Sequence, residues 1–445
     1  MTASEQLAQF AAGSKALPKL CREYKKERAT VHLKELVGGA LSFYAAAAVA
    51  KTGGVHIFVA EDRDAAAYLL NDFYNLLDEK QVYFFPSSYK RSAAYGAEDA
   101  QGVVQRTTAM NAVRGFTKGY LVVCTYPEAL AERVVDAATL QRDTIAVKLG
   151  DKISIAVLED ALADANFTRV DFVYEPGQYS VRGGIVDVFS YSESKPYRID
   201  FFGDEVDSIR RFNISSQLSA DKLDRVEIVP NLNAGEAPRV SFVQFAGSSA
   251  TCWFYDADYV LRRVNDLRRK VLADMEEPGQ IDRLLTSRNV LLRDMAGNSV
   301  VALRDNLPER PATAAVVFDT APQPKFNKNF EMLADDMIRN SLRGYATYIL
   351  SENKVQVERL ENIFHQIGRG QAAVRSLSVT LHEGFVDNDL KLCLYTDHQI
   401  FDRYQRYRIN GEIRRDEQMT VAELNQLKPG DYVVHIDHGV GRFGG

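Results

Sequence analysis

The segment FTRVDFVYEPGQYSVRGGIVDVFSYSESKPYRIDFFGDEVDSIRRFN, residues 167–213, carries the clearest fold signal in the chain. Apolar runs typical of short strands lie at 170–174, 179–189, 197–202 and 205–212. Glu175-Pro176-Gly177 ends the first run, because Pro presets φ and Gly supplies a positive φ. Gly203-Asp204 is a two-residue connection of the kind that closes a hairpin. The segment therefore predicts a compact antiparallel module.

Arg182-Gly183-Gly184 interrupts the second of these runs. Paired glycines inside a strand pattern predict a bulge or a place where another backbone approaches closely. Arginine and aromatic side chains dominate the energetics of many protein interfaces. Arg182, which lies between strand residues and beside two glycines, is therefore the strongest candidate for contact with a partner.

Two stretches of the sequence resemble a known family. Residues 175–213, with the RGGIVDVF core and the RIDFFGDEVDSIR hairpin, closely resemble the domain through which UvrB and the Mfd family, the bacterial transcription-repair coupling factors, bind the repair protein UvrA. The ending LKPGDYVVHIDHGVGRFGG, residues 427–445, resembles the opening strand of the RNA polymerase-interacting barrel of the Mfd family. UvrB has no such segment, so the N-terminal UvrB-like region of the Mfd family is the better match.

The resemblance also implies which residues bind UvrA. The family makes these contacts largely through arginines, which correspond here to Arg169 in FTRVD and to Arg182 in SVRGG, with Gly183 beside it. One position departs from the UvrB-type pattern RVRG, because this chain has Ser180 there. The contact that a further arginine would make is therefore not expected.

Phe189 and Arg198 are two weaker candidates for the UvrA-binding surface. For each of them a structural role competes with the binding role. Phe189 is equally well explained as a core aromatic, and Arg198 as a cross-strand partner of Asp200.

The resemblance implies a recruitment function. The chain is expected to bind UvrA and thereby couple stalled transcription to nucleotide excision repair. The full-length protein is expected to be an ATP-dependent DNA translocase, a helicase-like hydrolase that uses ATP and Mg²⁺, binds double-stranded DNA and displaces stalled RNA polymerase. Two alternatives stay open: a UvrB-like, ATP-driven damage-verification protein, and a DNA-binding module.

Composition fits a multidomain protein of the cytoplasm. The 445 residues are enough for about three domains, and 46% of them are hydrophobic. A net charge of −6 argues against a chain dominated by nucleic-acid binding. The N-terminus lacks signal-peptide features, and the apolar stretch 40–50 is too short to span a bilayer. The four cysteines are far apart and form no CxxC pair, which favours a reducing compartment over disulfides or structural zinc; they are Cys21, Cys124, Cys252 and Cys393.

The first part of the chain alternates between strand and helix patterns. Strands are predicted at 30–37, 55–60, 82–85 and 120–124, and helices at 40–51 and 64–77. This alternation predicts a mostly parallel sheet covered on both faces, as in nucleotide-binding helicase domains.

The phosphate-binding chemistry of such domains is missing. A phosphate loop follows the pattern GxxxxGK[ST], in which a lysine contacts the outer phosphates. The loop at the corresponding place, 36–42 (LVGGALS), keeps two glycines but has no lysine, and no Gly-Lys dipeptide occurs in the chain. We therefore expect a degenerate helicase-like domain with no cofactor in this chain. No nucleophile–base constellation for catalysis can be assembled.

Three short motifs have competing explanations. Asp204-Glu205-Val206-Asp207 spells the DExD box of helicases, but it follows a predicted hairpin turn, and a solvated hairpin explains it better. His435 and His438 have a spacing that suits a metal ion, but no further ligands lie nearby and a strand with a turn is expected. His382-Glu383 lacks the second histidine of a zinc protease helix. No metal site is therefore predicted.

A basic helix is predicted at 256–275, after a strand at 252–255. It carries Arg262, Arg263, Arg268, Arg269 and Lys270. Such a face can contact DNA phosphates, but its interleaved acidic residues favour a solvated surface.

The fold class predicted is α/β multidomain: a degenerate helicase-like parallel α/β domain with an inserted small antiparallel β-rich UvrA-binding module, followed by a second small α/β domain. The expected division is 1–128 first domain, 129–213 module, 214–320 return to the first domain with a strand at 224–229, 321–400 second α/β domain, 401–427 linker and 428–445 start of the truncated barrel. The two prolines of 320–324 mark the boundary before the second α/β domain. Helices at 326–342 and 354–366 and strands at 345–350 and 391–395 are expected in that domain.

Overall fold

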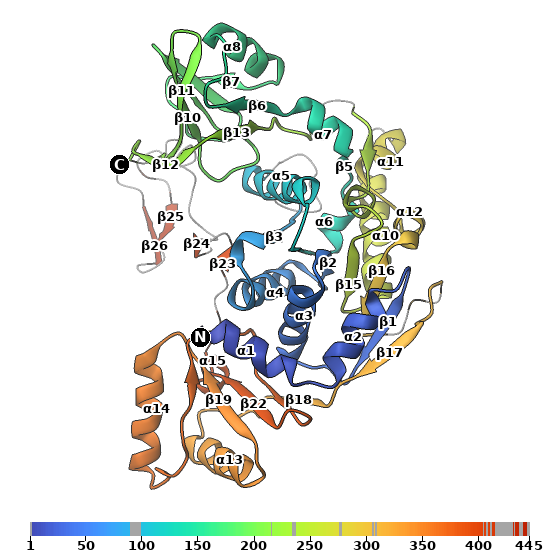
Figure 1. The fold of residues 1–445 in the computed structure, drawn as a ribbon, viewed down its shortest axis with the longest axis vertical. Helices are drawn as coiled ribbons and strands as arrows, with labels where there is room; N and C mark the ends of the chain where they lie inside the picture. The colour runs from blue at the N-terminus through green and yellow to red at the C-terminus, as the bar shows by residue number, and fades with distance from the viewer. Residues whose placement is uncertain are drawn as a thin grey trace. The chain divides into compact units, whose positions relative to one another are not determined.

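The computed structural model describes most of the chain (Figure 1). The described residues are 2–89, 99–214, 216–233, 237–275, 278–304, 307, 309–403, 405, 408–409, 412–413, 430, 432–435 and 439–442. Two compact units are present, Met1–Gln405 and Arg406–Gly445. Among the described residues no helix is long and apolar enough to cross a membrane.

A seven-stranded sheet forms the centre of the first unit. Its strand order is β17-β1-β16-β15-β2-β4-β3, and every neighbouring pair is parallel. The strands are β1 (Thr30–Lys34), β2 (Gly54–Val59), β3 (Val82–Phe84), β4 (Tyr120–Thr125), β15 (Thr251–Phe254), β16 (Ser299–Ala302) and β17 (Ala314–Val317). The predicted parallel α/β layout is confirmed for this part of the chain.

Helices cover this sheet and link its strands. They are α1 (Ala3–Ala12), α2 (Ala16–Tyr24), α3 (Ala40–Thr52), α4 (Arg63–Leu76), α5 (Ala100–Gly115), α10 (Ala257–Asp274), α11 (Ile281–Leu284) and α12 (Arg288–Asp294), with short helices η1 (Glu79–Gln81), α6 (Pro127–Ala131), α9 (Phe242–Ala246), η2 (Pro278–Gln280) and η3 (Met295–Gly297). The helices α4 and α5 pack against β3 and β4, and α3 packs against β4. Aspartates at the N-caps fix where two of the helices begin: Asp62 accepts from the Ala65 N–H, and Asp256 accepts from the Tyr259 N–H.

The chain leaves this sheet after β4 and returns to it at β15. Between them lies a six-stranded sheet of order β12-β11-β10-β9-β8-β7, antiparallel except for the β7–β8 pair. Its strands are β7 (Thr168–Arg169), β8 (Gln178–Arg182), β9 (Ile185–Val188), β10 (Tyr197–Phe202), β11 (Glu205–Phe212) and β12 (Ser219–Leu223). Two two-stranded pairs enclose it in the sequence: β6 (Ile145–Lys148) with β13 (Arg225–Ile228), and β5 (Val134–Val135) with β14 (Arg239–Val240).

The turns of the six-stranded sheet follow the sequence closely. Gly203 adopts a φ of +62° and joins β10 to β11 through the predicted two-residue connection. Gly177, with a φ of +86°, ends the approach to β8 as expected. Gly183 and Gly184 form a second two-residue turn between Arg182 and Ile185, so the bulge predicted there is wrong. The predicted close approach is present, since the Phe201 N–H donates to the Gly184 carbonyl at 2.7 Å.

Residues 170–174 were predicted to form a strand, and this prediction is wrong. β7 ends at Arg169, and the following backbone is irregular. The cause lies in polar side chains of β8: Ser180 Oγ and Arg182 Nη1 both donate to the Asp171 carbonyl, at 2.8 Å and 3.2 Å. This carbonyl is thereby satisfied outside a strand ladder. Val173 is buried, whereas Phe172 and Tyr174 are about half exposed.

One face of the six-stranded sheet forms the core of this module. Buried residues of β8 to β11 pack there with α8 (Ile155–Asp164) and the β6–β13 pair; among them are Tyr179, Val186, Ile199, Ile209, Leu158 and Val226. The module also contacts the helices of the seven-stranded sheet, where Arg114 of α5 donates to Glu227 at 2.6 Å. The helix α7 (Ala137–Asp143) precedes β6.

A five-stranded sheet of order β18-β21-β22-β19-β20 forms the second small α/β part. Its elements are β18 (Thr320–Pro322), α13 (Phe330–Leu342), β19 (Ala346–Leu350), α14 (Lys354–Gln366), β20 (Ser376–Leu377), β21 (Phe385–Asp387), β22 (Leu392–Thr396) and α15 (Asp397–Ile400). The residues predicted as a boundary begin its first strand, β18. α13 begins at Phe330 rather than 326, because Asn327 and Lys328 have positive φ and Asn329 caps the helix.

The second unit contains two described hairpins. They are β23 (Arg408–Ile409) with β24 (Glu412–Ile413), and β25 (Tyr432–His435) with β26 (Gly439–Arg442). The strand predicted for the HIDH motif agrees with β25, which ends at His435, whereas residues 436–438, with His438 and the predicted turn, lie outside the described residues. Most of the predicted linker 401–427 also lies outside them. No group of His, Cys, Asp or Glu among the described residues could hold a metal ion.

Candidate partner-binding surface

The outer face of the six-stranded sheet carries a row of polar residues. Directly opposite residues of antiparallel strands point to the same face. Asp187 on β9 lies opposite both Ser180 and Arg198, and Arg198 lies opposite Arg210. These residues therefore share the face that is turned away from the module core.

Asp187 holds two arginines of neighbouring strands. Arg198 binds both carboxylate oxygens of Asp187, through Nε at 2.7 Å and Nη2 at 2.9 Å. Arg182 Nη2 binds Oδ2 of the same carboxylate at 2.5 Å. Asp187 is only 1% exposed, so burial without these partners would be costly. The hydrogen bond to Asp187 raises the pKa of the Arg198 guanidinium, which stays charged.

A second pair extends the charge pattern. Asp200 on β10 accepts hydrogen bonds from Arg210 and from Ser208, both on β11. We call the set Arg182, Asp187, Arg198, Asp200 and Arg210 the arginine face. It holds three cations and two anions, so the face is cationic and its positive charges are fixed in position by hydrogen bonds.

Exposure and stacking together indicate which member of the arginine face a partner can reach. The side chains of Arg182 and Arg210 are 36% and 31% exposed, against 15% for Arg198. The Arg182 guanidinium also lies 4.8 Å from the centre of the Phe172 ring, which is itself 49% exposed. An accessible guanidinium stacked on an accessible aromatic ring resembles the anchors of protein interfaces.

Phe189 lies on the same side of the sheet as the arginine face, but its side chain is buried. It is 5% exposed and packs with Val173 and Phe212 in a small cluster separate from the main core of the module. The Arg198 guanidinium lies 4.5 Å from the centre of the Phe212 ring, so this cluster packs against the arginine face and helps to hold Arg198 in position. The structural role considered for Phe189 is present, and its direct role in binding stays a prediction.

Arg169 is not brought together with the other candidates. It lies opposite Tyr179, a residue of the module core, and its guanidinium pairs with Glu159 of α8 at 3.0 Å. Its side chain is 61% exposed on that side of the module. Gly183 is exposed at the β8–β9 turn with a φ of +60°, and no atom lies within 4 Å of the place where a Cβ would stand. A partner could therefore approach this turn closely.

The other motifs of the sequence take no part in this surface. Asp204, Glu205 and Asp207 are exposed on the β10–β11 hairpin, so the solvated hairpin expected for the DExD motif is confirmed. Four arginines of α10 are each paired with a carboxylate, which matches the interleaved charge pattern predicted for this helix; the pairs are Arg262–Asp258, Arg263–Glu128, Arg268–Asp282 and Arg269–Asp266.

The loop before α3 does not fit nucleotide phosphates. Leu41 stands directly before Ser42, at the position where the phosphate-loop pattern has lysine. The Ser42 hydroxyl donates to Asp72 at 2.6 Å. A Cβ on Gly39 would stand 2.1 Å from the carbonyl oxygen of Glu383, so the chain itself occupies the space beside this loop.

Sequence reasoning missed two parts of the surface. Asp187 was not singled out, although an aspartate between buried Val186 and Val188 signals a buried cationic partner. Arg198 was considered as a partner of Asp200, but it pairs with Asp187, and Arg210 takes Asp200. The strand register decides this choice, and no local pattern fixes the register of three strands at once.

Comparison with known proteins adds an independent line of evidence. A model of the UvrB interaction domain matches residues 145–233, which include the whole arginine face. A model of the CarD-like/TRCF RID domain matches residues 427–445. The resemblance found in the sequence is therefore confirmed at both places.

Curated relatives match most of the chain. Transcription-repair-coupling factors from Bacillus subtilis and Escherichia coli are each 23% identical to it, over 92% and 93% of its length. One from Staphylococcus epidermidis is 22% identical over 84%. The chain spans about two fifths of the length of these relatives, 41%, 42% and 38%. It is thus similar to the N-terminal region of transcription-repair-coupling factors.

Proposed function

We propose that this chain is the recruitment part of a transcription-repair-coupling factor, which binds UvrA and brings it to RNA polymerase stalled at DNA damage. Transcription is thereby coupled to nucleotide excision repair. The observation that carries this proposal is the arginine face, because it lies within the segment that matches the UvrB interaction domain.

The chemistry of the arginine face favours a protein partner with exposed carboxylates. Arg182 and Phe172 form the accessible anchor, and Gly183 leaves room for the backbone of a partner. Arg198 and Asp187 hold the anchor in place, so little side-chain entropy is lost on binding. We therefore assign the direct UvrA contact to Arg182, and a supporting role to Arg198 and Phe189.

The proposed contacts with UvrA and with RNA polymerase lie in different parts of the chain. The strands β25 and β26 fall in the segment matching the CarD-like/TRCF RID domain, and we propose that they belong to the surface that contacts RNA polymerase. The seven-stranded sheet is interpreted as a degenerate helicase-like domain, and the six-stranded sheet as a UvrA-binding module inserted between β4 and β15. ATP, Mg²⁺ and double-stranded DNA are assigned to a translocase motor in the whole protein.

The two alternatives have less support. A UvrB-like damage-verification protein needs ATP, and the loop before α3 does not fit phosphates. A DNA-binding module would use the arginines of α10, but four of them are paired with carboxylates. Paired surface cations attract phosphates less strongly than a net positive patch.

Calorimetry of the whole chain with purified UvrA tests the proposal. We expect binding that Arg182→Ala weakens roughly thirtyfold, because loss of a partly buried charged contact costs about 2 kcal/mol. Arg262→Ala on α10 is the matched control and should leave the affinity unchanged. Absence of binding by the folded chain would overturn the proposal. If Arg182→Ala binds UvrA as tightly as the control Arg262→Ala, only the choice of contact residue is overturned.

A further inference from the structure

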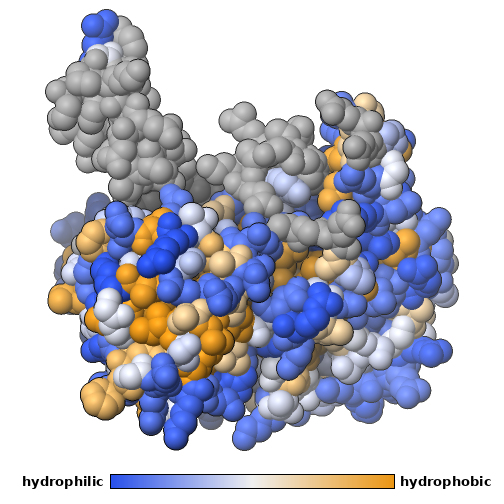
Figure 2. Space-filling view, turned by 90° about the horizontal axis from the view of Figure 1, so that it is seen from above, coloured by the Kyte–Doolittle hydropathy of each residue, from blue (hydrophilic) through white to orange (hydrophobic). Residues whose placement is uncertain are grey.

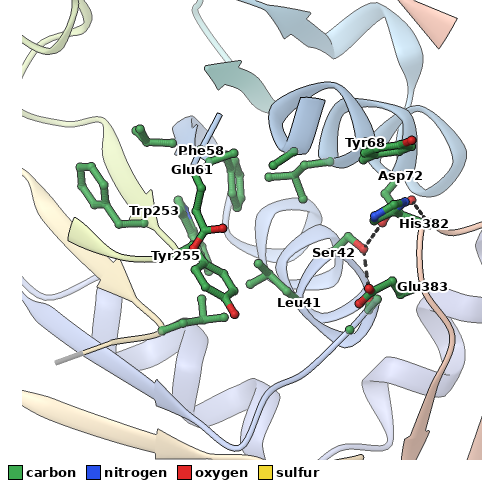
Figure 3. A pocket seen from close by; sticks show the side chains of 18 residues that line it. Leu41, Ser42, Phe58, Glu61, Tyr68, Asp72, Trp253, Tyr255, His382 and Glu383 are labelled. Atoms are coloured by element: carbon green, nitrogen blue, oxygen red, sulfur yellow. Dashed lines mark hydrogen bonds between the residues drawn. The ribbon is translucent and has the colours of Figure 1, made fainter. Parts of the chain in front are cut away.

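A cavity of about 300 Å³ opens beside β2 and β15 of the seven-stranded sheet (Figure 3). Ligands of open parallel sheets bind in the crevice outside the carboxyl ends of the strands. Phe58 and Val59 from the end of β2, and Phe254 and Tyr255 from the end of β15, line this cavity. Its volume is at the lower end of the range of small-molecule sites.

Apolar and aromatic side chains form most of the wall. Phe58 stacks on Trp253 with ring centres 4.9 Å apart, and Trp253 is held by a hydrogen bond from its Nε1 to His56 at 3.1 Å. Tyr68 of α4 stacks on His382 across the cavity from Tyr255, as Figure 3 shows. These rings give the cavity flat, pre-arranged walls.

Among the described residues, the charged groups that line the cavity are of one sign, while Arg304 lies beside it, 5.7 Å from the centre of the Tyr255 ring and paired with Asp256. Three acidic residues line it, Glu61, Asp72 and Glu383, and its described lining residues include no lysine or arginine. Burial raises the pKa of Asp72 to about 7, so the two glutamates carry most of the negative charge. Asp72 is buried and already accepts hydrogen bonds from Ser42 and from the His382 N–H. Glu61 and Glu383 are exposed, and Figure 3 places them on opposite sides of the cavity. A ligand would therefore meet carboxylates where it enters and aromatic rings further inside.

This arrangement rejects anions. A phosphate beside Gly38 and Gly39 would meet the Glu383 backbone, which lies against Gly39, and the nearby Glu383 carboxylate. Leu41 supplies no positive charge to balance it. A cation is favoured instead, because its positive charge is attracted to the carboxylates and to the faces of the aromatic rings.

We propose that this cavity binds a small organic cation with a flat apolar body, of the class of aromatic amidines and arylamines. The flat body lies among Phe58, Trp253 and Tyr255, and the cationic group lies between Glu61 on one side of the cavity and Glu383 on the other. Glu383 belongs to the segment before β21 of the five-stranded sheet, so the bound cation links that sheet to the seven-stranded one. This inference does not depend on UvrA binding.

Trp253 provides a direct readout, because it is the only tryptophan of the chain and it lines the cavity. The experiment titrates the whole chain with benzamidine, following Trp253 fluorescence and the heat of binding. Benzamide, which has the same shape without the charge, and spermidine, which has charge without a flat body, are the comparison probes. We expect saturable binding of benzamidine, at least about tenfold tighter than either comparison probe, which corresponds to about 1.4 kcal/mol.

Two variants separate charge from space. The double variant Glu61→Gln with Glu383→Gln should weaken benzamidine binding about tenfold and leave benzamide binding unchanged. Ala65→Phe, on the wall of the cavity, should abolish binding of both. Glu358→Gln on α14, which lies outside the cavity, is the matched control and should bind like the parent chain.

The proposal is overturned if benzamidine does not bind, if benzamide binds equally well, or if ATP binds and the double variant strengthens it. UvrA binding measured on the same protein samples shows whether the module is folded. A failure of the cavity proposal is thus distinguishable from a failure of the recruitment function.

Discussion

The arginine face and the cavity beside β2 and β15 are built in opposite ways. The arginine face comes from one run of strands between Arg182 and Arg210, and its charge is positive. The cavity joins residues as distant in sequence as Glu61 and Glu383, and its charge is negative. Figure 2 shows a face of the molecule on which hydrophobic residues gather in one patch, while hydrophilic residues cover most of the remaining coloured surface. The two proposed sites therefore differ in charge, and only the first is formed by one continuous segment of the sequence.

This difference separates a site that a motif can reveal from one that only the fold creates. The arginine face follows from the period-two pattern of adjacent hairpins, so the sequence carries most of its residues in one segment. The cavity needs β2, β15 and the residues before β21 in their final positions. Substitutions in one site should therefore leave the other unaffected, and the following predictions test that independence.

The largest effect is expected from Phe189→Ala. Removing a buried ring from the cluster with Val173 and Phe212 should lower the free energy of unfolding of the module by about 3 kcal/mol. During urea unfolding, far-UV circular dichroism follows the whole chain and Trp253 fluorescence follows the seven-stranded sheet, so the loss of stability should appear in the first signal and not in the second. Unchanged stability together with lost UvrA affinity would show instead that the ring contacts UvrA directly.

Asp187→Asn should have the next largest effect. It removes the buried acceptor of Arg182 and Arg198, and we expect a loss of about 2 kcal/mol, less than for a fully buried pair because both arginines are partly exposed. Asp221→Asn is the matched control, since Asp221 is exposed and lies 4.0 Å from Arg211. If Asp221→Asn lowers the free energy of unfolding as much as Asp187→Asn, the Asp187 carboxylate has no special structural role.

We expect Asp72 to make the stability of the seven-stranded sheet depend on pH. Burial raises the pKa of Asp72 to about 7, although hydrogen bonds from Ser42 and His382 oppose this shift. Because the folded pKa lies above the unfolded value of 3.8, the folded chain holds the proton more tightly. Protonated Asp72 therefore adds to the free energy of unfolding. This contribution is fully present below pH 4 and is lost as the pH rises through 7.

Asp72→Asn should therefore remove this dependence. Between pH 5 and pH 8 the parent chain should lose about 1 kcal/mol or more relative to the variant, followed by urea unfolding with Trp253 fluorescence. UvrA affinity at pH 7 should be the same for both. Parallel pH profiles of parent and variant would contradict the shifted pKa.

Arg169→Ala should have the smallest effect. Because Arg169 pairs with Glu159 on the α8 side of the module, we expect UvrA affinity to fall less than about threefold, the range of a weak surface ion pair. Calorimetry beside Arg182→Ala measures the difference. A loss as large as that of Arg182→Ala would extend the binding surface around the edge of the sheet to α8.

Local patterns in the sequence predicted the elements better than their contacts. The β10–β11 hairpin has the expected bounds, because Gly203-Asp204 and two alternating runs determine it without help from the rest of the chain. Residues 170–174 also alternate, but side chains of β8 capture the Asp171 carbonyl and the strand does not form. Contacts from nine and eleven residues away thus override a local preference.

The candidate sites divide along the same line. Arg182 was identified from its neighbouring glycines and from the resemblance, both of which are local. Asp187 was missed because its importance depends on strands that lie opposite one another. The cavity was not predicted at all, since the approach of Glu383 to Gly39 joins residues with no shared motif.

Amide hydrogen exchange of the whole chain, with and without UvrA, tests the central claim most directly, because it maps the bound surface without altering a residue. The account predicts that UvrA slows exchange at 171–174 and at the β8–β9 turn beside Arg182, while α10 and the residues around the cavity are unchanged. Slower exchange at α10 with none in the six-stranded sheet would contradict it.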